Sequence, residues 1–295
     1  MRICRFNGGR LGAVTEDGVV DVSHVLATLP ETRYPFPRHD ILIANLPHLR
    51  SDLERAAATG DARPVAGVTL ESPVANPGKL VAAPVNYRKH LEEVRDQAEI
   101  HHGNAAHARQ IHETGLFLKA TSSLIGPGEP IRLRMPDRRS DHEIELAVVI
   151  GRPASNVSAG DALRHVAGYA IGLDMTLRGP EERSFRKSID SYSVLGPWLV
   201  TADEIPDPAT LGFQLSVNGV PRQSAHTRDL VLSVPELIAL ASSFYTLHPG
   251  DVIFTGTPEG VGPVVPGDTI RARFDGIGEM TVVVEAAAPP DQLEI

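Results

Sequence analysis

Cysteine is almost absent from this sequence, since Cys4 is the only one in 295 residues. A single cysteine excludes an intrachain disulfide and fits a reducing compartment. The first ten residues, MRICRFNGGR, lack an apolar run of the length that a signal peptide needs. No stretch of about 20 apolar residues occurs, so a membrane span is not expected. We therefore expect a cytoplasmic protein.

Positively charged residues are fewer than negatively charged ones. Lys and Arg total 28 against 37 Asp and Glu, which gives a formal net charge of -9 at pH 7. The chain has no basic stripe of the kind that follows a nucleic-acid backbone, so nucleic acid is not expected as a partner. An acidic excess of this size is more typical of a protein kept in solution by its charge.

The sequence lacks the motifs of serine hydrolases, of dinucleotide-binding oxidoreductases and of phosphate-binding loops. The sequence contains no G-x-S-x-G, which disfavours a serine hydrolase. It contains no G-x-G-x-x-G, which disfavours a dinucleotide oxidoreductase. The glycine-rich stretch GTPEGVG lacks the Lys-Ser/Thr pair of a phosphate-binding loop.

Short runs with β-type alternation dominate what is present. Residues 1–72 predict a small N-terminal domain, with a β-meander followed by a helix over 38–60. Residues 73–295 predict a second domain with many short strands and one clear helix, in which Ser233 and Glu236 fit a capping box. The predicted fold class is therefore α+β and rich in β structure.

One of the expected strands carries two acids beside its core residues. Along DHEIELAVVIG the side chains alternate, so Ile144 and its apolar partners share one face while Glu143 and Glu145 share the other. A third acid, Asp174, ends the apolar run GYAIGLD, an unusual place for an unpaired charge. Carboxylate oxygens suit hard cations such as Mg²⁺ and Mn²⁺. From these residues alone, an exposed strand end and a metal site both remain open.

Seven motifs occur in an order that one known family shares. Together they resemble the fumarylacetoacetate hydrolase family over most of the chain after residue 75. That resemblance implies a mixed β-sandwich roll with the active site at its open end, and a homodimer. The matching stretches are NYRKHLEE, FLKATSSLIGPGEPI, HEIELAVVIGR, GLDMTLRG, KSID followed by LGP, NGVPRQ and PGDVIFTGTPEGVG.

The resemblance implies one divalent cation, Mg²⁺ or Mn²⁺, in each subunit. Carried over residue by residue, its ligands are Glu143, Glu145 and Asp174. In this interpretation Lys119, from FLKA, supports Glu143 and Glu145 from outside the ligand set. The alternative for Lys119 is a purely structural role.

His90 and Glu93 resemble the catalytic dyad of the family, in which the glutamate orients the histidine and the histidine activates a water molecule. Their i, i+3 spacing places them on one face of a helix. The segment that follows reaches to about residue 115 and is rich in histidine: His101, His102, His107 and His112. These spacings match no clean zinc pattern. We expect instead a solvated lid that orders over bound substrate.

Five further residues are expected at the substrate. The resemblance gives Lys187 a catalytic role at the developing oxyanion, and it gives Arg178 a planar fork for the substrate carboxylate. Thr257 would offer its hydroxyl and backbone N–H, and Tyr87 would line the pocket. Glu181 stands where many relatives have glutamine, and the stretch GPEERSFR beside it is short. Both departures bear on the part of the pocket that selects the acyl end.

These groups imply a metal-dependent hydrolase that cleaves a carbon–carbon bond of a 2,4-dioxo acid. The expected substrate is an acylpyruvate such as maleylpyruvate or fumarylpyruvate, from aromatic-compound catabolism, and the products are pyruvate and a carboxylic acid. The same site chemistry also supports a decarboxylase of an oxaloacetate-like acid, or an isomerase or hydratase of a 2-oxo dienoic acid. An alternative of another class is a non-catalytic protein that binds small acids.

Overall fold

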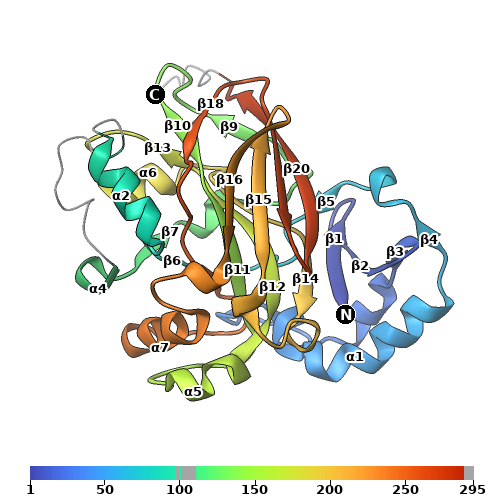
Figure 1. Cartoon of the computed structure of the whole chain (residues 1–295). Coiled ribbons are helices and arrows are strands. Elements are labelled where there is room, and N and C mark those ends of the chain that lie inside the picture. Colours follow the sequence, from blue (N-terminus) through green and yellow to red (C-terminus); the bar gives the residue numbers. More distant parts are fainter. Residues whose placement is uncertain (98–99, 101–110, 289–295) are drawn as a thin grey trace.

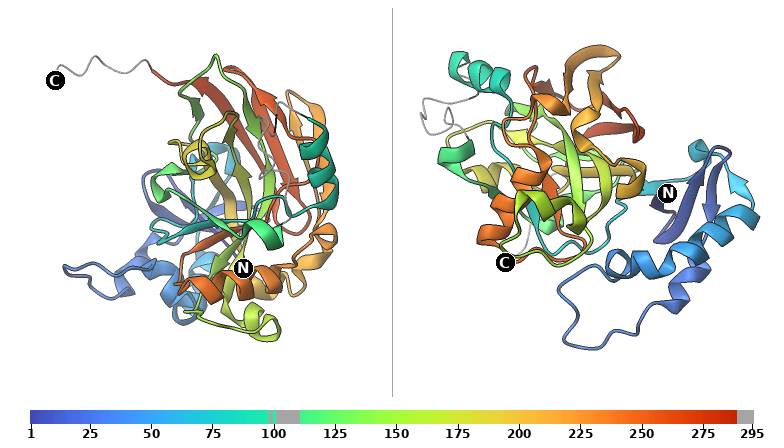
Figure 2. Two further views of the ribbon diagram at one scale, coloured as in Figure 1. Left: turned by 90° about the vertical axis from the view of Figure 1, so that its left-hand side faces the viewer. Right: turned by 60° about the horizontal axis from the view of Figure 1, so that its bottom comes forward.

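Three β-sheets form the framework of the chain, and two of them pack face to face (Figure 1). The computed structural model describes residues 1–97, 100 and 111–288. The predicted α+β class, rich in β structure, is confirmed. Figure 2 shows the N-terminal strands and their helix gathered at one side of the sandwich.

The largest sheet has 12 strands and runs through both the N-terminal and the C-terminal parts of the chain. Its order is β4-β3-β2-β1-β14-β12-β11-β17-β6-β7, with β5 beside β1 and β8 beside β14. The bounds of its strands are β1 Arg2–Phe6, β2 Arg10–Thr15, β3 Gly18–Asp21, β4 Ala62–Arg63, β5 Leu70–Glu71, β6 Leu80–Ala82, β7 Phe117–Lys119, β8 Leu124–Ile125, β11 Ile144–Ile150, β12 Val166–Asp174, β14 Ser193–Thr201 and β17 Val252–Phe254.

Two smaller sheets complete the β structure. The five-stranded sheet, in the order β16-β15-β19-β20-β9, covers one face of the largest sheet, and the three-stranded sheet has the order β13-β10-β18. The bounds of their strands are β9 Ile131–Leu133, β10 Ser140–His142, β13 Thr176–Leu177, β15 Gly212–Val217, β16 Val220–His226, β18 Gly262–Val264, β19 Thr269–Phe274 and β20 Gly278–Ala286.

Helices connect and flank the sheets. The α-helices are α1 Ile41–Thr59, α2 Arg88–Asp96, α4 Ile111–Thr114, α5 Ala159–Ala162, α6 Arg183–Lys187 and α7 Val234–Phe244. Short 3-10 helices are η1 Ser23–Thr28, η2 Val65–Gly67, η4 Thr121–Ser123, η5 Leu163–His165, η6 Ala202–Glu204, η7 Pro208–Thr210 and η8 Thr227–Asp229.

The helix predicted over 38–60 is present as α1, which begins three residues later than predicted and ends before Gly60, and the helix predicted after Ser233 is present as α7. At the start of α1 the Asp40 carboxylate accepts the Ile43 N–H at 3.0 Å, and the chain leaves the helix at Gly60. At the start of α7, Ser233 and Glu236 form the predicted capping box. Side-chain oxygens at these positions satisfy N–H groups that have no partner inside the helix.

Strand β11 is buried on both faces because a separate core covers each of them. Ile144 and the other residues of its face point into the core between the largest and the five-stranded sheets. Ala147 and Val149 point the opposite way, into a second core shared with the N-terminal strands and α1. The predicted alternation is therefore confirmed, but all seven residues of β11 are buried.

The N-terminal part extends the largest sheet and shares a core with the rest of the chain. The predicted β-meander is confirmed, since β1, β2 and β3 pair antiparallel in turn. β1 also pairs antiparallel with β14, where Ile3 lies opposite Leu199. The division into domains 1–72 and 73–295 stays a prediction, and both a sheet and a core run across it.

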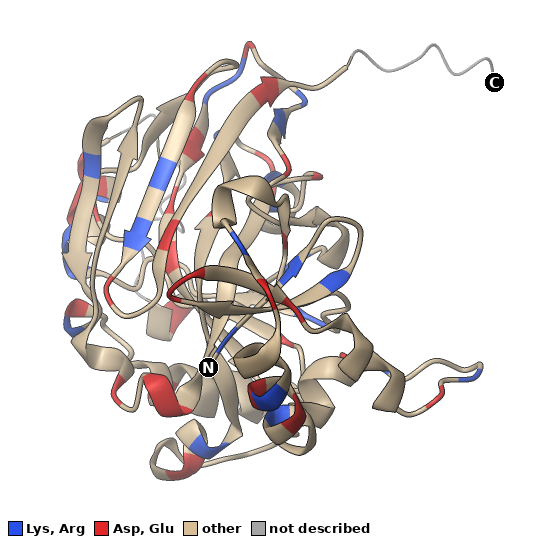
Figure 3. Cartoon of the chain, turned by 90° about the vertical axis from the view of Figure 1, so that its right-hand side faces the viewer, with Lys and Arg blue, Asp and Glu red and all other residues tan. Residues whose placement is uncertain are grey.

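Charges of both signs are interspersed over the face shown in Figure 3. Some surface charges form ion pairs, as Arg50 does with Glu54 and Asp203 at 2.8 Å each. In the part of the chain that the structure describes, no helix is long and apolar enough to span a membrane.

Candidate active site

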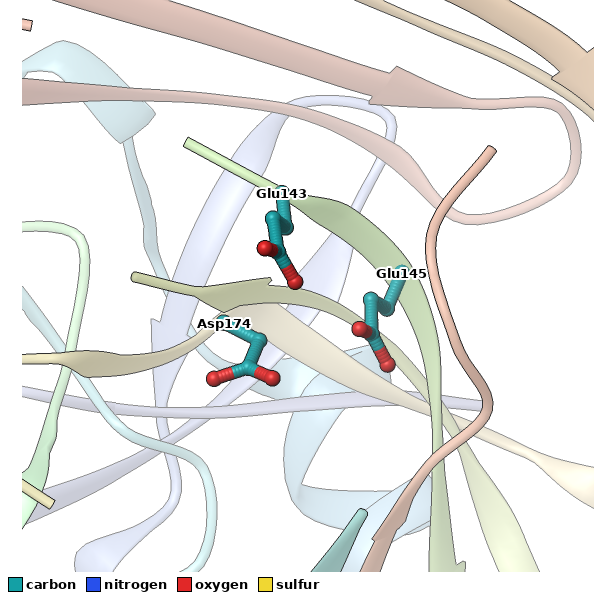
Figure 4. Close-up of side chains that lie close together, drawn as sticks. All are labelled: Glu143, Glu145 and Asp174. Atoms are coloured by element: carbon teal, nitrogen blue, oxygen red, sulfur yellow. The ribbon is translucent and has the colours of Figure 1, made fainter. Parts of the chain in front are cut away.

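Strand register brings the three predicted metal ligands together. β11 and β12 pair antiparallel with Ile144 opposite Leu173, which places Asp174 across from Glu143. The Asp174 N–H donates to the Glu143 carbonyl oxygen at 2.9 Å. Because cross-strand neighbours share a face, the Asp174 side chain lies on the side that carries Glu143 and Glu145. Figure 4 shows the three carboxylates close together, and ligand atoms of all three lie within 4.8 Å of one another.

The donor set fits a hard divalent cation. All three side chains are buried, and Glu145 is only 1% exposed. Glu145 accepts the Gly256 N–H at 2.6 Å and forms no ion pair with any described residue. A buried carboxylate without a counter-ion is costly, whereas a cation bound by oxygen ligands would compensate its charge.

The two glutamates differ in how their surroundings affect the proton. Burial acts to raise the pKa of Glu143, but the charges of Lys187 and Arg178 outweigh it and lower that pKa to about 2. Burial, followed by the negative charge of Asp174, raises the pKa of Glu145 well above its ordinary value. A cation at this site would therefore compete with a proton for Glu145.

Two buried lysines contribute positive charge to the carboxylate cluster. Lys187 Nζ donates to Glu143 Oε2 and Asp174 Oδ2 at 2.7 Å each, and to Thr176 Oγ1 at 2.6 Å. Lys119 Nζ donates to Asp174 Oδ1 and to a backbone carbonyl oxygen. Burial lowers the pKa of Lys119, an effect that the Asp174 charge opposes. Lys119 thus lies beside the predicted metal site, bonded to Asp174 and not to the two glutamates.

Helix α2 presents His90 and Glu93 on one face, as their spacing predicted. His90 Nδ1 lies 2.8 Å from Glu93 Oε2, and the Gly260 N–H donates to Glu93 Oε1 at 2.9 Å. When Nδ1 donates to the carboxylate, Nε2 is left as the basic nitrogen of the ring. The geometry is that of a histidine base oriented by a carboxylate.

One glycine-rich turn holds both parts of the site. Through Gly256 it reaches Glu145, and through Gly260 it reaches Glu93. The two glycines have φ of +97° and +92°, and a Cβ at Gly260 would lie 2.2 Å from the Arg222 carbonyl oxygen. Only glycine meets both requirements at this position.

A cavity of about 50 Å³ is lined by the histidine of the dyad and by the two glutamates. Its lining includes His90, Glu143, Glu145 and Lys187, which come from α2, the start of β11 and α6. These elements are distant in sequence but converge at one end of the sandwich (Figure 1). The structure therefore brings together the groups to which the family resemblance gives metal-binding and catalytic roles.

Two residues predicted to contact substrate line this cavity, but their polar groups are already engaged. Arg178 Nε donates to Asp141 Oδ2 at 2.7 Å, and its Nη2 donates to Glu143 Oε1 at 3.1 Å. The Thr257 hydroxyl donates to the Ile144 carbonyl oxygen at 2.9 Å. Their contacts with substrate stay predictions.

The other two predicted substrate contacts lie away from the cavity lining. Tyr87 packs in the main core, edge-on to Phe213 with ring centres 6.2 Å apart. Glu181 forms a two-pronged ion pair with Arg138, with both N–O distances at 2.8 Å. Neither residue is among those that line the cavity, and their contact with substrate also stays a prediction.

The predicted lid falls largely outside the described residues. His101, His102 and His107 are in that part of the chain, so the lid and the zinc alternative both stay predictions. His112 is described and belongs to α4.

Several polar residues of the site did not figure in the sequence prediction. Asp141 is fully buried and accepts a hydrogen bond from Arg178. It belongs to the same acidic stretch as Glu143 and Glu145, but the sequence analysis gave it no role. Thr176 donates its hydroxyl to Glu143 at 2.9 Å. Gln223 donates to the Thr257 hydroxyl at 2.8 Å. It is the last residue of the motif NGVPRQ, so the sequence could have indicated it as a site residue.

Comparison with known proteins identifies the class to which this site belongs. A family model described as fumarylacetoacetate (FAA) hydrolase C-terminal matches residues 79–285. The chain therefore belongs to the fumarylacetoacetate hydrolase family, and the resemblance carried by the seven motifs is confirmed.

Within the family, maleylpyruvate hydrolase of Aquipseudomonas alcaligenes is 55% identical over 286 residues, which cover 97% of this chain and 100% of that protein. A crystal structure of maleylpyruvate hydrolase from Sphingobium sp. SYK-6, in complex with manganese(II) and pyruvate, matches with a TM-score of 0.82 and 44% identity, covering 98% of this chain and 100% of that one. A mitochondrial oxaloacetate tautomerase of Bos taurus is 33% identical over 299 residues, covering 94% of this chain and 90% of that protein.

Proposed function

We propose that this chain is a divalent-metal-dependent hydrolase that cleaves an acylpyruvate, such as maleylpyruvate, in the catabolism of aromatic compounds. The observation that carries the proposal is a single cavity lined by a buried carboxylate pair and by the histidine of an oriented dyad. The 55% identity to a maleylpyruvate hydrolase supports the same reaction. A structural relative that binds manganese and pyruvate supports both the metal and one product.

Glu143, Glu145 and Asp174 would hold the cation, Mn²⁺ or Mg²⁺. When bound, the cation supplies Lewis-acid polarisation of the substrate's 2-oxo group. Lys187 adds positive charge beside the carboxylate ligands, because its ammonium lies 2.7 Å from Glu143 Oε2 and from Asp174 Oδ2. Lys119 holds Asp174 from the other side.

His90 and Glu93 activate the water. His90 Nε2 accepts a proton from a water molecule whose oxygen attacks the C4 carbonyl, and Glu93 stabilises the imidazolium that forms. The hydroxyl stays on C4 as the new carboxylic acid, the C3–C4 bond breaks, and its electron pair remains on C3. The proton that His90 took from the water balances the proton added to C3, which completes pyruvate and returns His90 to its neutral form. General-base catalysis of this kind contributes roughly 10²- to 10⁴-fold to the rate.

A screen with identified products tests the proposal. Purified protein loaded with Mn²⁺ is offered maleylpyruvate, fumarylpyruvate, acetylpyruvate and oxaloacetate, and the products are separated by chromatography. We expect pyruvate and the matching carboxylic acid from at least one acylpyruvate. Turnover of oxaloacetate alone would move the assignment to a decarboxylase or tautomerase, and the tautomerase relative makes this the relevant competitor. Tight binding of pyruvate without any turnover would support the non-catalytic alternative.

The proposal extends to assembly and organisation. The family resemblance supports a homodimer, which sedimentation equilibrium would measure directly. Cys4, as the only cysteine, supports a reducing cytoplasm. The start of the family match at residue 79 supports a domain boundary near residue 72.

A further inference from the structure

Among the described residues, three arginines line the cavity beside the carboxylates, and two of them each donate two side-chain hydrogen bonds. Arg178 binds two carboxylates through its fork. Arg186 donates to the backbone carbonyl oxygens of Glu181 at 2.8 Å and Leu177 at 3.1 Å, so it stabilises the loop that precedes α6. The third, Arg183, is different.

Arg183 is the first residue of α6, and its guanidinium has no hydrogen bond or ion pair with any residue in the described ranges. The side chain is partly buried, and its Cζ lies 5.5 Å from the centre of the Phe117 ring. Burial lowers the pKa of Arg183, but a guanidinium remains charged near neutral pH. A charged fork with free donors that lines a substrate cavity is suited to bind an anion.

The Phe117 ring also relates Arg183 to the metal ligands. Lys187 Nζ lies 5.5 Å from the centre of the same ring, so the two cationic groups are separated by at most twice that distance. Lys187 in turn bonds Glu143 and Asp174. A short substrate whose 2-oxo acid end meets the carboxylate cluster can therefore extend along Phe117 toward Arg183.

Building on the proposed function, we propose that Arg183 binds a carboxylate at the far end of the acyl group. Arg183 would then select acylpyruvates that are dicarboxylic acids over those with a neutral acyl tail. Phe117 offers a flat apolar surface to the carbons between the two ends. Arg183 belongs to the stretch between Arg178 and Lys187, whose sequence departs from the family pattern.

The test compares two substrates in the full-length, Mn²⁺-loaded protein. Maleylpyruvate carries the distal carboxylate, and acetylpyruvate lacks it. For Arg183→Gln we expect kcat/KM on maleylpyruvate to fall about 10- to 100-fold, mostly through KM, the range expected for losing a hydrogen bond to a charged group. On acetylpyruvate we expect less than about a twofold change. Arg183→Lys keeps the charge without the fork and should lie between wild type and Arg183→Gln on maleylpyruvate.

A matched control and a binding measurement complete the experiment. Arg152 is exposed, lies outside the cavity lining and has no side-chain partner among the described residues, so Arg152→Gln should change neither substrate. Calorimetry with maleate and with pyruvate gives a readout without turnover. We expect Arg183→Gln to weaken maleate binding and leave pyruvate binding intact.

The outcomes separate the two proposals. If the wild type cleaves both acylpyruvates and Arg183→Gln loses equally on both, or loses on neither, the role of Arg183 is overturned while the hydrolase assignment stands. If the wild type cleaves no acylpyruvate, the hydrolase assignment fails and the selectivity role fails with it.

Discussion

His90 Nδ1 lies 2.8 Å from Glu93 Oε2, one turn apart along α2. The second oxygen of Glu93 is held by the Gly260 N–H, so the carboxylate cannot turn away from the ring without breaking that bond. The pairing fixes which nitrogen of the imidazole is basic. It also stabilises the positive charge that the ring acquires when it takes a proton from water.

Replacement of His90 should therefore remove hydrolysis more than metal binding. For His90→Ala we expect kcat on an acylpyruvate to fall roughly 10²- to 10⁴-fold, the usual contribution of a general base. Any decarboxylation of oxaloacetate should survive, because losing CO₂ requires no attacking water. Steady-state kinetics on both substrates and Mn²⁺ calorimetry measure the difference. Equal loss of both reactions would contradict the division of roles, and Glu93→Gln should give a smaller loss of hydrolysis than His90→Ala.

Glu145→Gln tests the metal site itself. The substitution keeps the shape of the side chain but removes a carboxylate that accepts only the Gly256 N–H and has no ion pair in the described part of the chain. We expect Mn²⁺ affinity and metal-dependent turnover to be lost. The melting temperature without metal should be unchanged or higher, because the substitution removes a buried carboxyl group whose ionised form is destabilised by burial and by Asp174.

Thermal unfolding with and without Mn²⁺ checks this prediction. A cation that binds only the folded state raises the melting temperature of the wild type, and that rise should vanish in Glu145→Gln. Glu279→Gln is the matched control, since Glu279 is a surface carboxylate paired with Arg271. A variant that retained wild-type turnover would rule Glu145 out as a ligand.

The metal ligands could be predicted from sequence because their pattern is local. Acids spaced i, i+2 on an apolar strand share a face, and the family motifs added Asp174. Their closeness depends on the β11–β12 register, in which Asp174 lies across from Glu143. Periodicity supplies the faces of a strand but not its pairing partner.

Other features had no local signal. The pairing of β1 with β14 joins residues about 200 positions apart, and nothing in either strand specifies the other. Arg183 is one of several charged residues in GPEERSFR. Only the folded chain shows that nearby Arg186 donates hydrogen bonds, whereas the Arg183 guanidinium has no partner in the part of the chain that the structure describes. The turn that joins Glu145 to Glu93 was visible as glycines, but its hydrogen bonds required the structure.

Gly256→Ala should weaken both the fold and the metal site. Gly256 has φ of +97°, and a Cβ there would lie 2.7 Å from the Asn86 Cβ. An L-residue in that conformation is strained by about 1–3 kcal/mol, and the displaced N–H would no longer hold Glu145. We expect a lower free energy of unfolding in urea and a weaker affinity for Mn²⁺.

The control for this variant is Gly67→Ala. Gly67 lies in an exposed turn where a Cβ would meet nothing within 4 Å, so both quantities should stay near the wild-type values. If Gly256→Ala lost stability but bound Mn²⁺ as tightly as the wild type, the hydrogen bond to Glu145 would be irrelevant to the metal.

Cys4 offers a probe of the junction between the N-terminal strands and the rest of the sheet. Burial raises the pKa of its thiol to about 12. The thiolate is the reactive form, so a disulfide reagent at pH 8 should leave the folded protein unlabelled and modify it once denatured. The rate of labelling under native conditions would then report how often β1 separates from its neighbours.

The same shift in pKa predicts how stability changes in alkali. An unfolded chain releases the thiol proton above about pH 8.5, whereas the folded protein keeps it until its pKa of about 12. Because the folded state binds more protons in this window, the free energy of unfolding should fall as pH rises through it. Cys4→Ala should lose this part of the pH dependence, which urea titrations at pH 8 and pH 10 would measure. Rapid labelling of the native protein, or an identical slope in Cys4→Ala, would show that the thiol is not protected by the packing around β1.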